Sequence, residues 1–288
     1  HMELIDRIEA TMPFFIPLCV FIFGVIWGSF LNVCIYRIPQ GHSIVWPPSS
    51  CQCGKRIPFY FNIPVIAWFM LKGKAACCDE ILSFRYPLVE ALTGTFFVFS
   101  WLNHQSIVAM VGMLFIAILI AATFIDLDHM IIPDIFSIGG MLLGVMVSIF
   151  IPQLHGFSQG GMEAHWYSWI ESMLGIFVGT SMIYWIATIG EIILKKPAMG
   201  EGDVKFLAAI GAFTGWQGAL FSLFGGAFIG TIIILPYLLI QQLKQPKEPK
   251  LQELPFGPFL AIGAIVYFLW LNNFVDAYFS QIVDIFTL

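Results

Sequence analysis

Long runs of apolar residues occupy most of this 288-residue chain and limit what it can fold into. A helix that spans a bilayer needs about 20 mostly apolar residues. Hydrophobic residues make up 59% of the chain and charged residues only 11%, against roughly 25% charged in a soluble domain. We therefore expect an all-α polytopic membrane protein with about eight transmembrane helices. The expected spans are residues 13–35, 86–102, 107–125, 131–151, 169–194, 204–216, 218–240 and 258–279.

The positive charges are distributed unevenly between the loops that join these spans. Twelve of the thirteen Lys and Arg residues lie after the first, fifth or seventh span or beside the sixth, and Arg7 alone precedes the first. Because cytoplasmic loops of membrane proteins are enriched in Lys and Arg, these loops are expected on the cytoplasmic side and both termini on the other. The net charge of −5 offers no basic surface for nucleic acid, so none is expected as a partner.

The expected domains follow from this layout. Residues 1–12 combine an expression-tag remnant at His1-Met2 with a short extracytoplasmic start, and 13–35 form the first transmembrane helix. Residues 36–85 form a cytoplasmic segment rich in aromatic residues and cysteine, too long for a simple turn. This segment is either a small folded subdomain or an amphipathic element on the membrane surface. Residues 86–280 form the main transmembrane domain, and 281–288 a tail.

Two aspartates at the ends of predicted spans are candidates for chemistry. Asp126 ends the third span and Asp203 begins the sixth, so both reach the cytoplasmic face. Acidic residues at membrane depth are costly, and two carboxylates that share a proton can activate water and polarise a carbonyl group. Gly200 and Gly202 let a substrate strand run close beside Asp203. The alternative is that these acids only cap helices or pair with Lys205 and His129.

The residues around both aspartates resemble a known pair of motifs. Gly200-Glu-Gly-Asp203 and the upstream run Phe-Ile-Asp126-Leu-Asp-His-Met-Ile-Ile-Pro-Asp134 are similar to the signature of the type IV prepilin peptidases, which are GxGD-type intramembrane aspartyl proteases. Residues 28–39, 62–64, 85–90 and 255–261 also resemble the family pattern, in the expected order. The resemblance covers about residues 25 to 265.

The resemblance implies an activity, a substrate and roles for individual residues. Asp126 and Asp203 become the catalytic pair of an endopeptidase in the bacterial inner membrane, with its active site facing the cytoplasm. The implied partners are the lipid bilayer and prepilin or pseudopilin substrates, cut after a Gly that follows a basic leader. Asp128 is the rival to Asp126. The residues implied to orient the pair are Gly200, Gly202, Lys205, Asp128, His129 and Asp134.

Four cysteines bracket the middle of the cytoplasmic segment. Cys51 and Cys53 form a Cys-x-Cys pair, and Cys77 and Cys78 are adjacent. Stable disulfides are uncommon in the cytoplasm, and four thiolates can hold a tetrahedral Zn²⁺. We expect zinc here, although family members often carry two Cys-x-x-Cys pairs and adjacent cysteines ligate one ion only with backbone strain. A two-ligand remnant, a redox-sensitive pair or idle thiols are the alternatives.

The resemblance also implies a second activity, methylation of the newly exposed N-terminal residue with S-adenosylmethionine as the methyl donor. The chain has no Gly-rich nucleotide loop after a predicted strand, so a soluble methyltransferase fold is not expected. Glu90, Arg37 and Asn62 are candidate polar contributors near the cytoplasmic segment. For Glu90 the alternative is a cap at the start of the second span, or an ion pair with Arg85.

Two functions of other classes remain as alternatives. In a transporter or channel, Asp126, Asp203, Glu90 and Glu171 would relay ions or protons. The clustering of acids at one membrane face and the lack of an inverted repeat argue against it. A scaffold that docks a secretion machine through the aromatic segment would leave Gly200-Glu-Gly-Asp203 unexplained. The oligomeric state is not predicted by the sequence.

Overall fold

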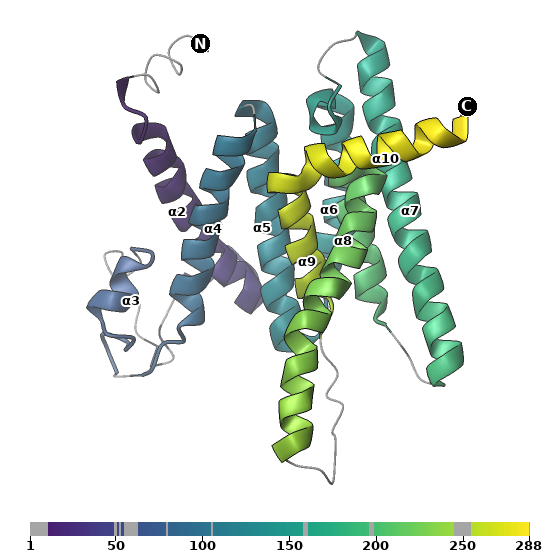
Figure 1. Ribbon diagram of the computed structural model, residues 1–288. Helices are drawn as coiled ribbons and strands as arrows, with labels where there is room; N and C mark the ends of the chain where they lie inside the picture. The colour runs from purple at the N-terminus through teal and green to yellow at the C-terminus, as the bar shows by residue number, and fades with distance from the viewer. Residues whose placement is uncertain are drawn as a thin grey trace. The chain divides into compact units, whose positions relative to one another are not determined.

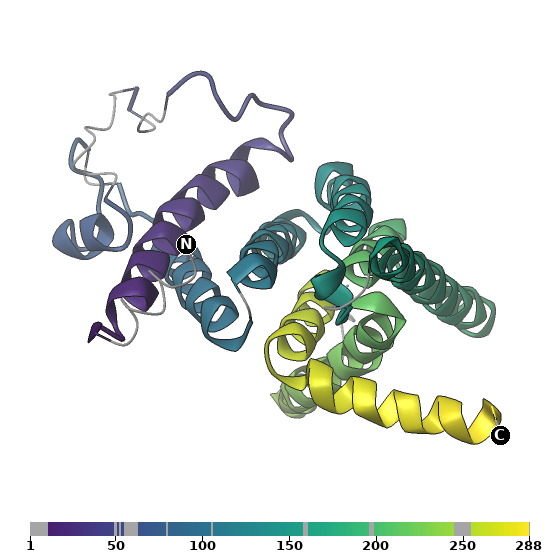
Figure 2. The ribbon, with the colours of Figure 1, turned by 90° about the horizontal axis from the view of Figure 1, so that it is seen from above.

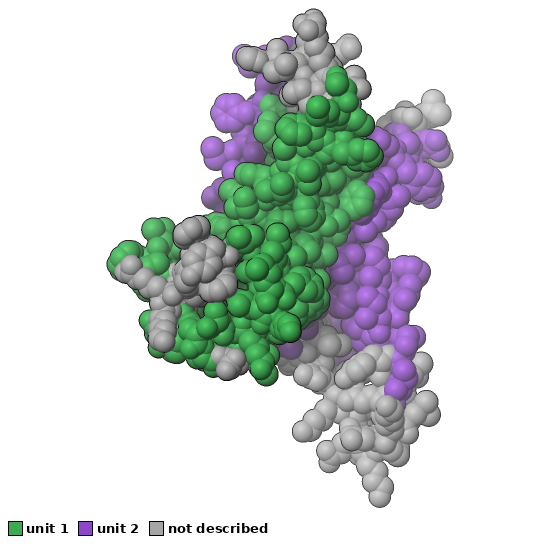
Figure 3. Space-filling view, turned by 90° about the vertical axis from the view of Figure 1, so that its left-hand side faces the viewer, with its two compact units in different colours: residues 1–121 green, residues 122–288 purple. Residues whose placement is uncertain are grey.

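The computed structural model describes residues 11–48, 51, 53–54, 63–78, 80–104, 106–157, 161–195, 199–244 and 255–287. Within these residues the regular secondary structure is helical, apart from one antiparallel bridge between Lys74 and Ile81. The chain divides into two compact units, residues 1–121 and 122–288 (Figure 3). Of the described helices, five are long and apolar enough to cross a membrane, and the apolar helix Asp134–Phe150 is shorter. The predicted all-α polytopic class is confirmed.

The first unit is built on a tightly packed helix pair. Helix α2 (Phe15–Arg37) lies against α4 (Arg85–Asn103), and α5 (Ser106–His129) follows (Figure 1). A Cβ atom added to Gly24 would lie 2.7 Å from the Cα of Gly94, and one on Gly28 would lie 2.7 Å from the Cα of Glu90. The pairing of 24 with 94 and of 28 with 90 makes the two helices antiparallel. Small residues at the crossing let the backbones approach this closely.

The described part of the segment between α2 and α4 supports a small folded subdomain. It contains the short helix α3 (Ile66–Met70) and the bridge between Lys74 and Ile81. The indole Nε1 of Trp68 donates a hydrogen bond to the carbonyl oxygen of Leu82 at 3.1 Å, and the same ring packs edge-on against Phe84. These contacts connect α3 to residues 81–84, the extended segment that leads into α4.

The second unit contains the end of α5 and a bundle of further helices. Helix α7 has 33 residues, a length of about 50 Å at 1.5 Å per residue, so it is longer than the hydrocarbon core of a bilayer. It begins earlier than the predicted span 169–194. The elements of this unit after α5 are α6 (Asp134–Phe150), η2 (Pro152–His155), α7 (Met162–Leu194), α8 (Glu201–Lys244), α9 (Gly257–Val266), η3 (Tyr267–Leu271) and α10 (Asn272–Thr287).

Helix α8 is a hairpin of two helical arms. Gly215 interrupts it with φ 70° and ψ −176°, a conformation that favours glycine. A Cβ atom on Gly179 of α7 would lie 3.1 Å from the carbonyl oxygen of Leu207 and 3.3 Å from the Cβ of Ala219. In a straight helix these two residues would be about 18 Å apart, so the chain must reverse direction near Gly215. The arms match the predicted spans 204–216 and 218–240.

The C-terminal helices differ from the single predicted span 258–279. The chain runs upright through α9 and η3 and then turns, so that α10 lies crosswise to α9 (Figures 1 and 2). The polar pair Asn272 and Asn273 lies at the turn, and the hydroxyl of Tyr267 donates to Asp276 Oδ1 at 2.6 Å. Phe274 is 72% exposed. Polar residues and exposed aromatic side chains on one helix are typical of an element that lies at a membrane surface.

Candidate functional site

Asp126 lies in the last turns of α5 and is buried, with 5% of its surface exposed. Its Oδ2 atom accepts a hydrogen bond from the backbone N–H of Gly257 at 3.1 Å. Gly257 is the first residue of α9, where the first backbone N–H groups of a helix have no partner inside the helix. The start of α9 therefore provides a fixed donor that holds one oxygen of the Asp126 carboxylate.

Asp203 lies in the first turn of α8 and is half-buried. Its backbone N–H donates to the carbonyl oxygen of Gly200 at 3.2 Å, which shapes the turn before the helix. The positive end of the helix dipole favours a carboxylate at this position. A Cβ atom on Gly202, the residue before Asp203, would lie 3.5 Å from Ile132, and the Gly257 that holds Asp126 contacts the same side chain. The structure thus brings together the two segments that carry the aspartates, which lie 77 residues apart in the sequence.

Ile132 connects the segments that carry these residues. It is buried between Gly202 and Gly257. An added Cβ atom would lie 3.5 Å from the Ile132 Cβ if placed on Gly202, and 3.0 Å from the Ile132 Cδ1 if placed on Gly257. The α5–α6 connection, the first turn of α8 and the start of α9 therefore meet around one side chain, next to the Asp126 carboxylate.

Gly257 is the residue of this site that sequence reasoning missed. In the sequence, its segment 255–261 resembles the family pattern but indicates no role for the glycine itself. A Cβ atom on Gly257 would lie 2.6 Å from Asp126 Oδ2, which is shorter than the contacts that Cβ atoms make in proteins. The available signal was a glycine directly before proline at a helix start, a position that the close approach of another group can require.

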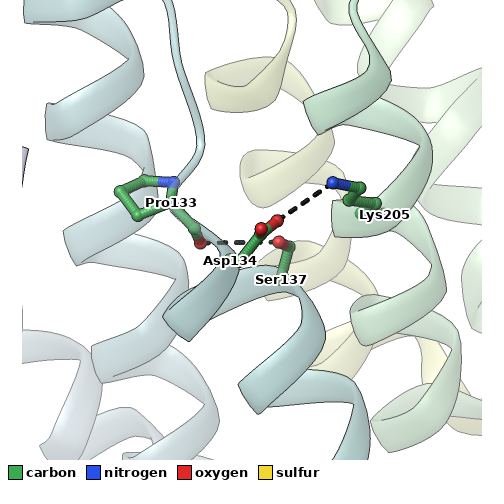
Figure 4. Close-up of polar contacts among 4 residues, drawn as sticks. All are labelled: Pro133, Asp134, Ser137 and Lys205. Atoms are coloured by element: carbon green, nitrogen blue, oxygen red, sulfur yellow. Dashed lines mark hydrogen bonds and ion pairs between the residues drawn. The ribbon is translucent and has the colours of Figure 1, made fainter.

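The other residues predicted to orient the pair lie farther toward solvent. Asp128 and His129 are exposed, as is Gly200, whereas Gly202 is half-buried. Lys205 Nζ forms an ion pair with Asp134 Oδ1 at 3.0 Å (Figure 4). Ser137 Oγ donates to the carbonyl oxygen of Pro133 at 3.4 Å beside this pair. Lys205 thus connects the first turn of α8 to the first turn of α6.

Replacing Lys205 with Ala is expected to have only a small effect. The two side chains of its ion pair are 42% and 64% exposed, and pairs at this exposure contribute less than about 1 kcal/mol to the free energy of unfolding. We expect unchanged folding and cleavage within about threefold of wild type, measured in parallel on purified protein. A loss of cleavage as large as that expected on replacing Asp126 with Asn would contradict this supporting role and place Lys205 in the reaction.

The four cysteine side chains form one cluster in the first unit. Their sulfur atoms all lie within 4.8 Å of one another, with 3.2 Å between Cys51 and Cys78 and 3.3 Å between Cys53 and Cys77. Four sulfurs around a zinc ion at 2.3 Å would be about 3.8 Å apart. Cys77 and Cys78 are 3.9 Å apart, so adjacency does not keep either thiol from the cluster. The donor set fits a tetrahedral metal ion.

The crowding of these thiols is itself informative. Hydrogen bonds with Cys51 and Cys53 raise the pKa of Cys77 to about 12, and desolvation makes a smaller contribution in the same direction. Four thiolates at this spacing repel one another unless a cation lies between them. Such a cluster is therefore stable either as protonated thiols or around a metal ion.

The three residues considered for methyl transfer have different surroundings. The guanidinium group of Arg37 donates to the carbonyl oxygens of Ser43 at 2.9 Å and Pro47 at 2.7 Å, so it holds the turn after α2. Glu90 is buried, and its Oε2 atom accepts a hydrogen bond from the backbone N–H of Val65 at 2.7 Å. Asn62 lies outside the described residues.

These features define a helical membrane protein with two carboxylates at one end of its second unit and a cysteine cluster in its first. In comparisons with known proteins, one family model matches residues of the first unit and a second model matches mainly residues of the second. Residues 22–104 match the bacterial peptidase A24 N-terminal domain, and residues 113–235 match the type IV leader peptidase family. No solved structure is a significant match to the chain.

Curated relatives extend this match over nearly the whole chain. A prepilin leader peptidase/N-methyltransferase of Aeromonas salmonicida is 30% identical, over 98% of this chain and 100% of the relative. Proteins of the same name from Dickeya chrysanthemi and Myxococcus xanthus are 31% and 32% identical, over 91% and 83% of this chain and 95% and 68% of the relatives. The chain belongs to the type IV leader peptidase family.

Proposed function

We propose that this protein is an aspartic endopeptidase that removes the leader of prepilins or pseudopilins, with Asp126 and Asp203 as its catalytic pair. The observation that carries the proposal is that the segments bearing the two aspartates meet around Ile132, with Asp126 held by the N–H of Gly257. The names of the relatives supply the substrate class. Of the two aspartates at the end of α5, Asp126 is the better candidate because it is buried, whereas Asp128 is exposed.

The geometry suggests how such a pair would work. Two carboxylates at short range are not both ionised at low cost, so a pair of this kind holds one proton between its two carboxyl groups. The ionised carboxylate takes a proton from water as the water attacks the scissile carbonyl carbon, and the protonated carboxyl group donates to the carbonyl oxygen. The N–H of Gly257 keeps Asp126 fixed during this exchange.

The charge distribution supports a cytoplasmic position for the site. In the second unit the ends of α5, α7 and α8 and the beginnings of α6, α8 and α9 lie at one end (Figure 1). Lys195, Lys205 and Lys244 lie at or near these helix ends, whereas residues 150–162 at the other end contain no Lys or Arg. By the positive-inside rule the end with the aspartates faces the cytoplasm. A substrate with a basic cytoplasmic leader and an apolar helix would present its scissile bond there.

The test is cleavage by the full chain in lipid nanodiscs of a peptide with a Lys/Arg leader, a Gly and an apolar helix. We expect one cut after the Gly, found by mass spectrometry. A matched peptide in which the leader cations are replaced by Glu should be cut more slowly, because the exposed Glu201 near the site would repel it. Absence of cleavage of the basic peptide would overturn the proposal and favour a transporter.

A second activity, N-methylation of the processed substrate with S-adenosylmethionine, is proposed from the names of the relatives. The methyl donor is a cofactor of the reaction as proposed, and the structure assigns no place for it. The test is transfer of labelled methyl groups to a peptide that already lacks its leader. Because this peptide needs no cleavage, the experiment measures methyl transfer alone.

The cysteine cluster is proposed to bind zinc that stabilises the subdomain between α2 and α4. We expect about one zinc ion per chain by elemental analysis and loss of that zinc in Cys77→Ser, because structural sites need four ligands. The variant should also show faster proteolysis within residues 36–85, since metal binding contributes folding energy in small subdomains. Cys19→Ser is the matched control, because Cys19 lies in α2 outside the cluster. Wild-type protein that folds fully without metal would refute the zinc site.

A further inference from the structure

Glu90 is a buried acid that the peptidase site does not use. It lies at the crossing of α2 and α4 in the first unit and is 7% exposed. The groups near its carboxylate in the described part of the chain are neutral: the N–H of Val65 and the side chains of Ser29 and Asn32. A carboxylate removed from water without a cation is costly, and among the described residues no cation is recorded beside this one.

Asn32 supplies an independent sign that a ligand is missing at this point. Its side chain is 4% exposed, and Nδ2 donates to the carbonyl oxygen of Tyr86 at 3.1 Å. Its Oδ1 atom is buried and has no hydrogen-bond partner among the residues that the structure describes. Buried acceptors in folded proteins are nearly always satisfied, and an unsatisfied one calls for an explanation such as a bound group. Asn32 thus offers an acceptor that lacks a donor, near the Glu90 carboxylate.

Strain in the neighbouring backbone also marks this place. Val65 precedes α3 and adopts φ 61°, a region that is unfavourable for a β-branched residue. Its N–H nevertheless reaches the Glu90 carboxylate at 2.7 Å. Strained residues of this kind persist where the surroundings hold them, and they concentrate at ligand sites.

We propose that Glu90 and Asn32 bind the primary ammonium group of the processed substrate, the new N-terminus that is the methyl acceptor. An ammonium group has three donors and one positive charge, which match the Glu90 carboxylate and the free Asn32 Oδ1. The inference rests on the proposed methyl transfer. It assigns this buried site to the amine and leaves the cleavage site with the two aspartates.

The methyl donor also carries an ammonium group, but it fits this site less well. Its amino-acid end brings a carboxylate beside the ammonium, and that carboxylate would be repelled by Glu90. The donors near this position, Val65 N–H and Ser29, are already directed at Glu90. An N-terminal amine brings positive charge without a neighbouring carboxylate, so the peptide is the better occupant.

The experiment measures methyl transfer to a synthetic apolar peptide with a free N-terminal amine and no leader. Labelled S-adenosylmethionine is the donor and the full chain is in nanodiscs. In Glu90→Gln the new side-chain carbonyl can still accept from Val65 N–H, so the cap of α3 is kept while the charge is lost. We expect the KM for the peptide to rise about 30-fold, as for a lost charge-assisted hydrogen bond. The KM for the donor should be unchanged.

Three further variants guard against a structural explanation. Asn32→Leu removes the unsatisfied acceptor and should raise the peptide KM about tenfold in a folded protein. Ser29→Ala removes a donor to Glu90 but no acceptor for the ammonium, so its KM should stay within about threefold. Glu90→Asp keeps the charge and should recover part of the affinity. All should cut the leader-bearing peptide at the wild-type rate.

The outcomes separate this inference from the proposed function on which it rests. Wild-type protein that methylates no free-amine peptide would refute the methyl transfer itself, and cleavage would be unaffected by that result. A wild-type protein that methylates, together with Glu90→Gln and Asn32→Leu variants whose peptide KM stays within twofold, would overturn only the ammonium site. A rise in the KM for the donor alone would also overturn it.

Discussion

Asp126→Asn is expected to lower the rate of leader cleavage at least about 1,000-fold while the protein stays folded. Asparagine has the same shape, and its side-chain oxygen can still accept from the N–H of Gly257, so the hydrogen bond at 3.1 Å is kept. It cannot exchange a proton with water, and the loss of a positioned acid or base costs about 100- to 10,000-fold. Asp203→Asn should cause a similar loss, because the two carboxyl groups act as one unit.

The matched control is Asp128→Asn, two residues along the same helix. Asp128 is exposed, whereas Asp126 is 5% exposed. We expect cleavage by Asp128→Asn within about fivefold of wild type, since an exposed carboxylate at this distance contributes mainly through its field. Single-turnover cleavage in nanodiscs measures all three variants. If Asp128→Asn were inactive and Asp126→Asn active, the catalytic role would pass to Asp128.

Gly257→Ala is expected to reduce cleavage about 100-fold. The new Cβ would lie 2.6 Å from Asp126 Oδ2 and 3.0 Å from the Cδ1 of Ile132, so the carboxylate, the isoleucine or the start of α9 must shift. A displacement of about 1 Å in a catalytic group can cost 100-fold in rate. The loss should appear in kcat rather than in KM for the peptide, because the methyl group alters the position of a reacting group.

Gly139→Ala is the matched control for this variant. Gly139 lies in α6 of the same unit, and a Cβ there would meet its nearest neighbour at 3.8 Å, an ordinary contact. We expect full activity and a small gain in stability from the better helix propensity of alanine. Equal activity of Gly257→Ala and Gly139→Ala would show that the contact between α9 and Asp126 does not affect the reaction.

The sequence predicted the class of fold because apolar length and the scarcity of charge are properties that a single chain displays directly. It also separated the two arms of α8, since Gly215 and Trp216 interrupt the apolar run where the helix reverses. At the C-terminus it predicted one continuous span, where the structure has α9, η3 and α10. The run 258–279 is apolar enough to span, and only the local polarity at Asn272 and Asn273 indicates that α10 turns aside.

At the site, motif and spacing identified the two aspartates but not what holds them. The hydrogen bond from Gly257 joins residues 131 positions apart, and no periodicity or local propensity reports such a contact. The same holds for Asn32, whose unsatisfied oxygen becomes visible only when α2 and α4 are packed together. The cysteine spacing is compatible with a four-ligand cluster but also with a two-ligand remnant or idle thiols, and it is the fold that brings all four sulfurs together. Long-range packing decided each of these cases.

The most direct test of the central proposal gives Asp203→Asn two peptides in one sample, with S-adenosylmethionine. One peptide carries a basic leader, and the other has a free N-terminal amine and no leader. Mass spectrometry then distinguishes intact, cleaved and methylated products. We expect the leader-bearing peptide to stay intact while the free-amine peptide is methylated as by wild type. Cleavage of the leader-bearing peptide at a rate within about tenfold of wild type would contradict the assignment of Asp126 and Asp203 as the catalytic pair.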